Sequence, residues 1–175
     1  AIFCMLLGAA VLTANDALLK WMTGNYHVAQ IMFCRGLFVS IPLALLIWRS
    51  GGLRSLHTDN PKGHFIRALL VILGTFLFVS GLKYLTLTDA IAIAFAGPLF
   101  ITALAPSLLG EHVGWRRWIA VLTGFIGIVI IMRPGGSIFQ WAALFPLAAS
   151  LTGALRDILT RGMSATETSV ALLFY

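Results

Sequence analysis

Two side chains of opposite charge lie inside long apolar segments near the beginning of the sequence. Asp16 follows Asn15 in the first apolar segment, and Arg35 lies in the first half of the second. A charge below the headgroups of a membrane is costly, so it usually faces a protein interior or water and has a partner. At about 1.5 Å per residue, Asp16 would lie roughly 7 Å and Arg35 about 10 Å below the same membrane surface. An ion pair between the two segments is therefore geometrically possible.

Three interpretations of these charges are open. In the first, Asp16 and Arg35 line an outward vestibule, in which Arg35 attracts anionic groups of a substrate; Asn15 is counted with them as a substrate-binding candidate. In the second, Asp16 and Arg35 form a buried pair that holds two helices together. In the third, Asp16 pairs with Lys20, four residues later on the same helical face.

A proline marks a second candidate position. Pro98 lies about 13 Å into an apolar segment counted from Asp89, near the middle of the membrane. Its ring removes a backbone hydrogen bond and leaves the carbonyl of Ala94 without its usual donor. Such groups are tolerated where they line a polar cavity. Phe95 and Pro98 would then form a kink beside the substrate, or a kink that only serves packing.

Side chains suited to a planar ligand lie near the middle of the third segment. Thr75, Phe76 and Phe78 could stack on such a ligand and donate a hydrogen bond to it. The alternative is that the aromatic side chains face lipid or serve packing. Gly74 and Gly81 share one helical face seven residues apart, which favours close contact between helices.

The elements that carry these residues are long apolar segments. They approach the roughly 20 residues that cross a bilayer core, and they cover residues 2–19, 28–48, 68–82, 90–109, 118–132 and 138–159, with a seventh beginning near 169. Only 10% of the 175 residues are charged and 59% are hydrophobic, whereas about a quarter are charged in a soluble domain. The sequence predicts an all-α integral membrane protein, folded as an antiparallel bundle of transmembrane helices.

The gaps between the apolar segments are alternately rich and poor in lysine and arginine. The gaps after the second, fourth and sixth segments hold eight cations, which are Arg49, Arg54, Lys62, Arg67, Arg116, Arg117, Arg156 and Arg161. The other gaps hold three, which are Lys20, Lys83 and Arg133. Because basic loops stay in the cytoplasm, the first helix is predicted to enter the membrane from the cytoplasm. Cations that flank apolar segments explain the net charge of +6 by topology and lipid contact, without a nucleic-acid partner.

A short sequence repeat relates the first and sixth segments. Residues 16–22 and 157–163 share the pattern Asp-x-Leu-x-Lys/Arg-x-Met. The second copy comes five helices after the first, and because five is odd the copies must point in opposite directions, as in the inverted repeats of secondary transporters. We expect a first five-helix repeat at 1–135 and an incomplete second repeat at 136–175. Arg156 and Asp157 are interpreted as a loop-facing pair, with an inner vestibule related to Asp16 as the alternative.

Several ordered motifs resemble the EamA-type drug/metabolite transporter superfamily. They are Asp89-Ala90, the stretch 95–100 (Phe-Ala-Gly-Pro-Leu-Phe), Leu109-Gly110-Glu111, the stretch 115–118 (Trp-Arg-Arg-Trp) and the stretch 124–129, together with Arg35 and the stretch 155–161. The resemblance implies ten helices in two inverted repeats, cytoplasmic termini, and export or uptake of small metabolites. The chain departs from this pattern after six helices and the start of a seventh, so we expect an N-terminal fragment. Asn15-Asp16 and the stretch 172–175 are similar to the S-adenosylmethionine-uptake and riboflavin-uptake branches.

The predicted function is that of a secondary transporter, which moves a small organic metabolite by alternating access. The membrane is expected to be a bacterial inner (plasma) membrane. Coupling to protons through Asp16 and a homodimeric assembly are open. The alternative is an integral membrane enzyme of lipid metabolism, which would need paired acidic or histidine residues at one interface. The sequence has no such arrangement, and we expect neither an enzyme nor a cofactor or metal site.

Overall fold

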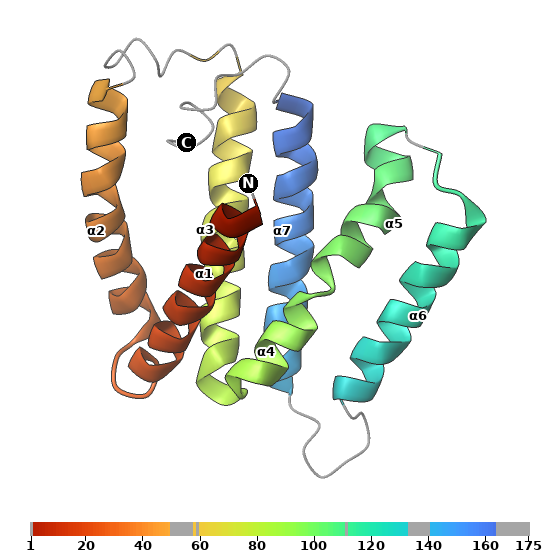
Figure 1. Cartoon of the computed structure of the whole chain (residues 1–175), viewed down its shortest axis with the longest axis horizontal. Coiled ribbons are helices and arrows are strands. Elements are labelled where there is room, and N and C mark those ends of the chain that lie inside the picture. The colour runs from red at the N-terminus through yellow and green to blue at the C-terminus, as the bar shows by residue number, and fades with distance from the viewer. Residues whose placement is uncertain (1, 50–57, 59, 111, 133–140, 164–175) are drawn as a thin grey trace.

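The fold is built from α-helices throughout the part of the chain that can be described. The computed structural model describes residues 2–49, 58, 60–110, 112–132 and 141–163. Its elements are α1 (Ile2–Met22), α2 (Val28–Arg49), α3 (Pro61–Tyr84), α4 (Leu87–Ala94), α5 (Gly97–Leu109), α6 (Trp115–Met132), the 3₁₀ turn η2 (Trp141–Ala143) and α7 (Leu144–Met163). Figure 1 shows them as one bundle, in which α3 and α7 lie at the centre.

Among the described residues, five spans are long and apolar enough to cross a membrane. They are α1, α2, α3, the stretch Leu87–Leu109 and the stretch Trp141–Met163. Their large apolar side chains face outward: Phe3 is 76% exposed and Phe38 is 74% exposed. Such a surface is suited to lipid and not to water, so the prediction of an all-α integral membrane bundle is confirmed. The fifth predicted segment, 118–132, forms most of α6, whose 18 residues extend about 27 Å.

The seam between α3 and α7 is the most extensive helix contact in the described part of the chain. The two helices run antiparallel (Figure 1), and Gly74 and Gly81 of α3 face α7. A Cβ atom added at Gly74 would lie 2.7 Å from Thr152 Oγ1, and one added at Gly81 would lie 2.9 Å from Pro146 Cδ. At the other end of the seam, Arg67 Nε donates a hydrogen bond of 3.0 Å to Thr160 Oγ1. The two glycines therefore permit close helix contact, as the sequence predicts.

The third helix begins earlier than its apolar segment. The sequence predicts a loop up to Arg67, but α3 already begins at Pro61. Asn60 caps it, because Asn60 Oδ1 accepts a hydrogen bond of 3.0 Å from the backbone N–H of Gly63. An asparagine cap followed by a proline in the first turn is a favoured helix start. Asn60 and Pro61 therefore begin a helix well before the apolar segment starts.

The fourth predicted segment is two helices and not one kinked helix. α4 ends at Ala94 and α5 begins at Gly97, so Pro98 lies in the first turn of α5. At the break, the backbone N–H of Ala96 donates to the carbonyl of Ile93, three residues back, at 2.9 Å. Proline is tolerated in a first turn, because a donor there has no partner within its helix. The predicted kink at Pro98 is therefore a full break, two residues earlier.

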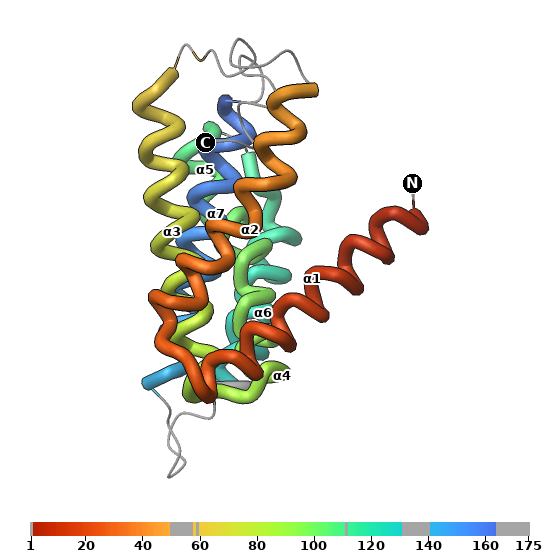
Figure 2. The backbone as a smooth tube through the Cα atoms, turned by 90° about the vertical axis from the view of Figure 1, so that its left-hand side faces the viewer, coloured from red at the N-terminus to blue at the C-terminus, as the bar shows by residue number. Residues whose placement is uncertain are grey.

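Several cations of the rich gaps lie at helix ends on one side of the bundle. Arg49, Lys62, Arg117 and Arg161 belong to helix ends at the top of Figure 1, and Lys20 belongs to the opposite end. Arg54 and Arg133 lie outside the described residues. α1 and α7 run in opposite directions, as the proposed duplication requires, and α1 leans away from the rest of the bundle (Figure 2). The division into repeats at residue 135 stays a prediction.

Candidate functional site

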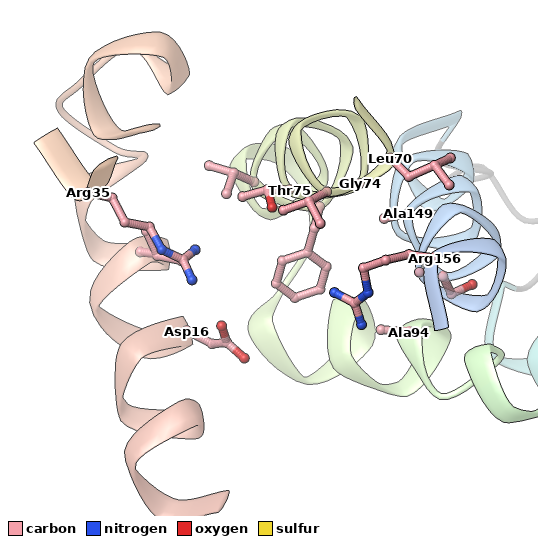
Figure 3. A pocket seen from close by; sticks show the side chains of 14 residues that line it. Asp16, Arg35, Leu70, Gly74, Thr75, Ala94, Ala149 and Arg156 are labelled. Atoms are coloured by element: carbon pink, nitrogen blue, oxygen red, sulfur yellow. The ribbon is translucent and has the colours of Figure 1, made fainter. Parts of the chain in front are cut away.

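A cavity of about 220 Å³ lies between the first helices of the chain and α7. Five helices contribute to it: α1, α2, α3, α4 and α7. Its lining residues are Asp16, Leu19, Arg35, Leu70, Val71, Gly74, Thr75, Phe78, Val79, Ala94, Ala149, Ser150, Gly153 and Arg156. Figure 3 shows this cavity from close by. Helices far apart in the sequence therefore build one site.

Three charged side chains face this cavity from two sides. Asp16 and Arg35 extend into it from α1 and α2, and Arg156 extends into it from α7 on the other side (Figure 3). Asp16 is half-buried, whereas Arg35 is exposed. Within the described residues, Asp16 forms no ion pair with Arg35 or with Lys20. The structure thus brings Asp16 and Arg35 to one cavity without joining them in a salt bridge.

Lys20 has other partners than Asp16. Its Nζ donates hydrogen bonds of 2.5 Å to the carbonyl of Leu82 and 2.7 Å to the carbonyl of Leu85. Both carbonyls belong to the C-terminal end of α3, where four backbone acceptors lack partners within the helix and the helix dipole is negative. The interpretation in which Asp16 pairs with Lys20 is not what the structure shows. Lys20 instead fastens the end of α1 to the end of α3.

Arg156 also lines this cavity, although the sequence favoured a loop-facing pair with Asp157 and left an inner vestibule as the alternative. Its Nε and Nη2 donate hydrogen bonds of 2.9 Å and 2.6 Å to the same oxygen, Asp157 Oδ1. The sequence interpretation placed this pair toward a loop. Arg156 lies seven residues before the end of α7 at Met163, which is about 10 Å along the helix. That depth was the available signal for a role inside the bundle.

The polar and aromatic candidates of α3 divide between two faces. Thr75 and Phe78 line the cavity. Phe76 is 44% exposed and lies in a separate surface groove with Met32 and Ile72. Residues two positions apart on a helix point about 200° away from each other, so Phe76 and Phe78 cannot serve the same site.

The remaining candidates are not among the residues that line the cavity. Asn15 does not line the cavity, but its Nδ2 is 3.5 Å from Asp16 Oδ1, at the limit of a hydrogen bond. Phe95 is 70% exposed at the break between α4 and α5, and Pro98 is exposed as well. Ala94 does line the cavity. Since Pro98 has no N–H to offer the carbonyl of Ala94, this carbonyl is a candidate acceptor for a ligand.

This chemistry suits binding and not bond breaking. The cavity presents one carboxylate, two guanidinium groups and the hydroxyls of Thr75 and Ser150. In the described ranges, no group of three His, Cys, Asp or Glu side chains could hold a metal ion. Charged side chains of both signs around a cavity between membrane helices are typical of sites that take up a polar ligand within the bilayer.

The fold and the site define a multi-pass helical membrane protein with a charged cavity between its helices. The model of the EamA-like transporter family matches residues 1–133, and the chain belongs to this family. The resemblance described from the motifs is thereby confirmed.

Several relatives within this kind of transporter are similar to the chain. The chain is 32% identical to the S-adenosylmethionine uptake transporter of Rickettsia bellii over 93% of the chain and 56% of the relative. It is 30% identical to the riboflavin transporter of Vibrio cholerae over 93% of the chain and 54% of the relative. It is 35% identical to the riboflavin transporter of Rhizobium johnstonii over 66% of the chain and 38% of the relative.

These comparisons point to a transporter and not to an enzyme. The chain spans about half the length of the curated relatives it matches. No solved structure matches it.

Proposed function

We propose that this chain forms part of a secondary transporter, which moves a small organic metabolite across a bacterial inner membrane by alternating access. The observation that carries the proposal is the cavity itself, in which Asp16, Arg35 and Arg156 meet inside a bundle of apolar helices. Charges at such depth are costly unless they face a ligand, water or a partner. The names of the relatives, which are S-adenosylmethionine and riboflavin transporters, support a metabolite of this size.

The proposed roles follow from the position of each side chain. Arg35 is exposed at the mouth of the cavity and attracts anionic groups of the substrate. Thr75 offers a hydroxyl, and Phe78 offers a face on which a planar ring can stack. S-adenosylmethionine and riboflavin both carry a planar nitrogen heterocycle, which suits this wall. Asp16 is the residue through which transport would couple to protons.

The proposed orientation follows the distribution of cations. The first helix enters from the cytoplasm, so the ends of α2, α5 and α7 face the cytoplasm. Asp16 and Arg35 then open toward the outside. In this orientation Lys20 joins α1 to α3 at the outer end of the bundle.

Uptake into proteoliposomes tests this function. The full-length gene product is reconstituted and supplied with radiolabelled S-adenosylmethionine or riboflavin, with and without a proton gradient. We expect uptake of at least one of them, and an Arg35→Lys variant that reaches the membrane in normal amounts without transporting. Loss of membrane abundance in that variant would instead favour a structural role for Arg35. Uptake that does not respond to the gradient would contradict coupling through Asp16.

A further inference from the structure

The cavity holds more charge than a neutral ligand requires. Two guanidinium groups and one carboxylate face it, and the described part of the chain gives Asp16 and Arg35 no ion-pair partner. Asp16 is half-buried, and a half-buried charge without an ion-pair partner is unfavourable, so the ligand that fits best supplies a cation for it. Building on the function proposed above, we infer that the substrate is a zwitterionic amino-acid derivative, whose carboxylate binds Arg156 and whose cationic group binds Asp16.

Arg156 has donors left for a carboxylate. A guanidinium group has five N–H donors, and two of them go to Asp157 Oδ1. Nη1 and one hydrogen of Nη2 remain, and together they form the two-pronged end of the guanidinium that matches a carboxylate. Asp157 fixes the other edge of the group, so the prong that enters the cavity is held in one orientation. Figure 3 shows the guanidinium pointing into the cavity beside Ala94.

Asp16 supplies the complementary charge across the cavity. Its carboxylate approaches from α1, on the side opposite to Arg156 (Figure 3). Lys20, the nearest cation along its own helix, is engaged by the carbonyls of Leu82 and Leu85. Asp16 therefore keeps acceptors for a substrate ammonium or sulfonium group. Arg35, at the mouth, guides the anionic end of the ligand inward and balances Asp16 when the cavity is empty.

This arrangement of charges discriminates between the two ligands that the names of the relatives suggest. S-adenosylmethionine carries a carboxylate and two cationic groups, whereas riboflavin is uncharged at neutral pH. Riboflavin would supply no carboxylate for the remaining donors of Arg156 and no cation for the carboxylate of Asp16. A site built to pair a charged group rejects an analogue that lacks it, because its own polar groups are then left unpaired. The cavity therefore selects for the zwitterion.

Matched ligands test this inference on the full-length gene product in detergent and in proteoliposomes. The probes are S-adenosylmethionine, its decarboxylated analogue, which keeps both cationic groups, and riboflavin. We expect the decarboxylated analogue to bind between about tenfold and a hundredfold more weakly, the loss expected for one charge-assisted contact. Arg156→Gln should weaken S-adenosylmethionine by a similar factor and leave the analogue within about twofold. Asp16→Asn should weaken both.

Two control variants distinguish the loss of a ligand contact from a general structural effect of the substitution. Arg117→Gln removes an exposed arginine outside the cavity and should change neither ligand. Arg156→Gln combined with Asp157→Asn removes both partners of the exposed ion pair and should behave as Arg156→Gln does. Equal binding of S-adenosylmethionine and its analogue would overturn the inference, as would an Arg156→Gln variant that weakens both equally. Riboflavin uptake that is insensitive to Arg156→Gln would overturn it while the transport function stands, and uptake of none of the probes would count against both.

Discussion

The seam between α3 and α7 leaves no room for an added methyl group at Gly74. At Gly74, a new Cβ would lie 2.7 Å from Thr152 Oγ1 and 3.7 Å from the carbonyl oxygen of Ala149. Thr152 Oγ1 is held in place by a hydrogen bond of 2.8 Å to that carbonyl. Gly74→Ala must therefore move the helices apart or displace Thr152. Overpacking of this kind costs about 1–3 kcal/mol.

Thermal unfolding of the full-length gene product in detergent measures this cost. A loss of 1 kcal/mol lowers Tm by roughly 2–4 °C in a chain of this size, so Gly74→Ala should lower Tm by several degrees. Adding Thr152→Ala removes the close oxygen and should restore most of the loss. Gly127→Ala is the matched control, because an added Cβ there meets nothing within 4 Å. Equal melting of Gly74→Ala and Gly127→Ala, or no rescue by Thr152→Ala, would refute the close-packed seam.

Two further substitutions probe the end of α1 and the beginning of α5. Lys20→Met leaves the carbonyls of Leu82 and Leu85 without their charged donor, and should cost about 1–3 kcal/mol, measured as a lower Tm. An unchanged Tm would show that Lys20 does not fasten α1 to α3. Pro98→Ala supplies a backbone N–H at the break between α4 and α5, so it should raise Tm and slow uptake. A lower Tm with unchanged uptake would contradict a role for the break in transport.

Most of the helix boundaries could be predicted because a membrane-spanning helix is visible as a continuous apolar segment in the sequence. α1 and α2 agree with their apolar segments to within three residues at each end. The differences arise where polar residues continue a helix or where hydrogen bonding stops inside an apolar segment. The first turns of α3 are polar, so hydropathy predicts a loop there, although Asn60 caps the beginning of a helix. The break after Ala94 leaves no trace in hydropathy.

The site could be predicted only in part, because its members depend on how each helix is rotated about its axis. Asp16 and Arg35 are visible in the sequence as charges in apolar surroundings, and both reach the cavity. Arg156 sits beside an acidic neighbour, so local pairing concealed its second role. Phe76 and Phe78 look equivalent in sequence, and only the seam of α3 with α7 decides which of them faces inward.

Substrate protection at two neighbouring positions tests most directly whether this cavity binds the transported ligand. Cys4 and Cys34 are free and exposed, so both are first replaced by serine. Thr75→Cys then places one thiol in the cavity, and Phe76→Cys places one on the other face of α3. The account predicts that S-adenosylmethionine slows alkylation of Thr75→Cys at least several-fold and leaves Phe76→Cys unchanged. Protection of Phe76→Cys without protection of Thr75→Cys would contradict it.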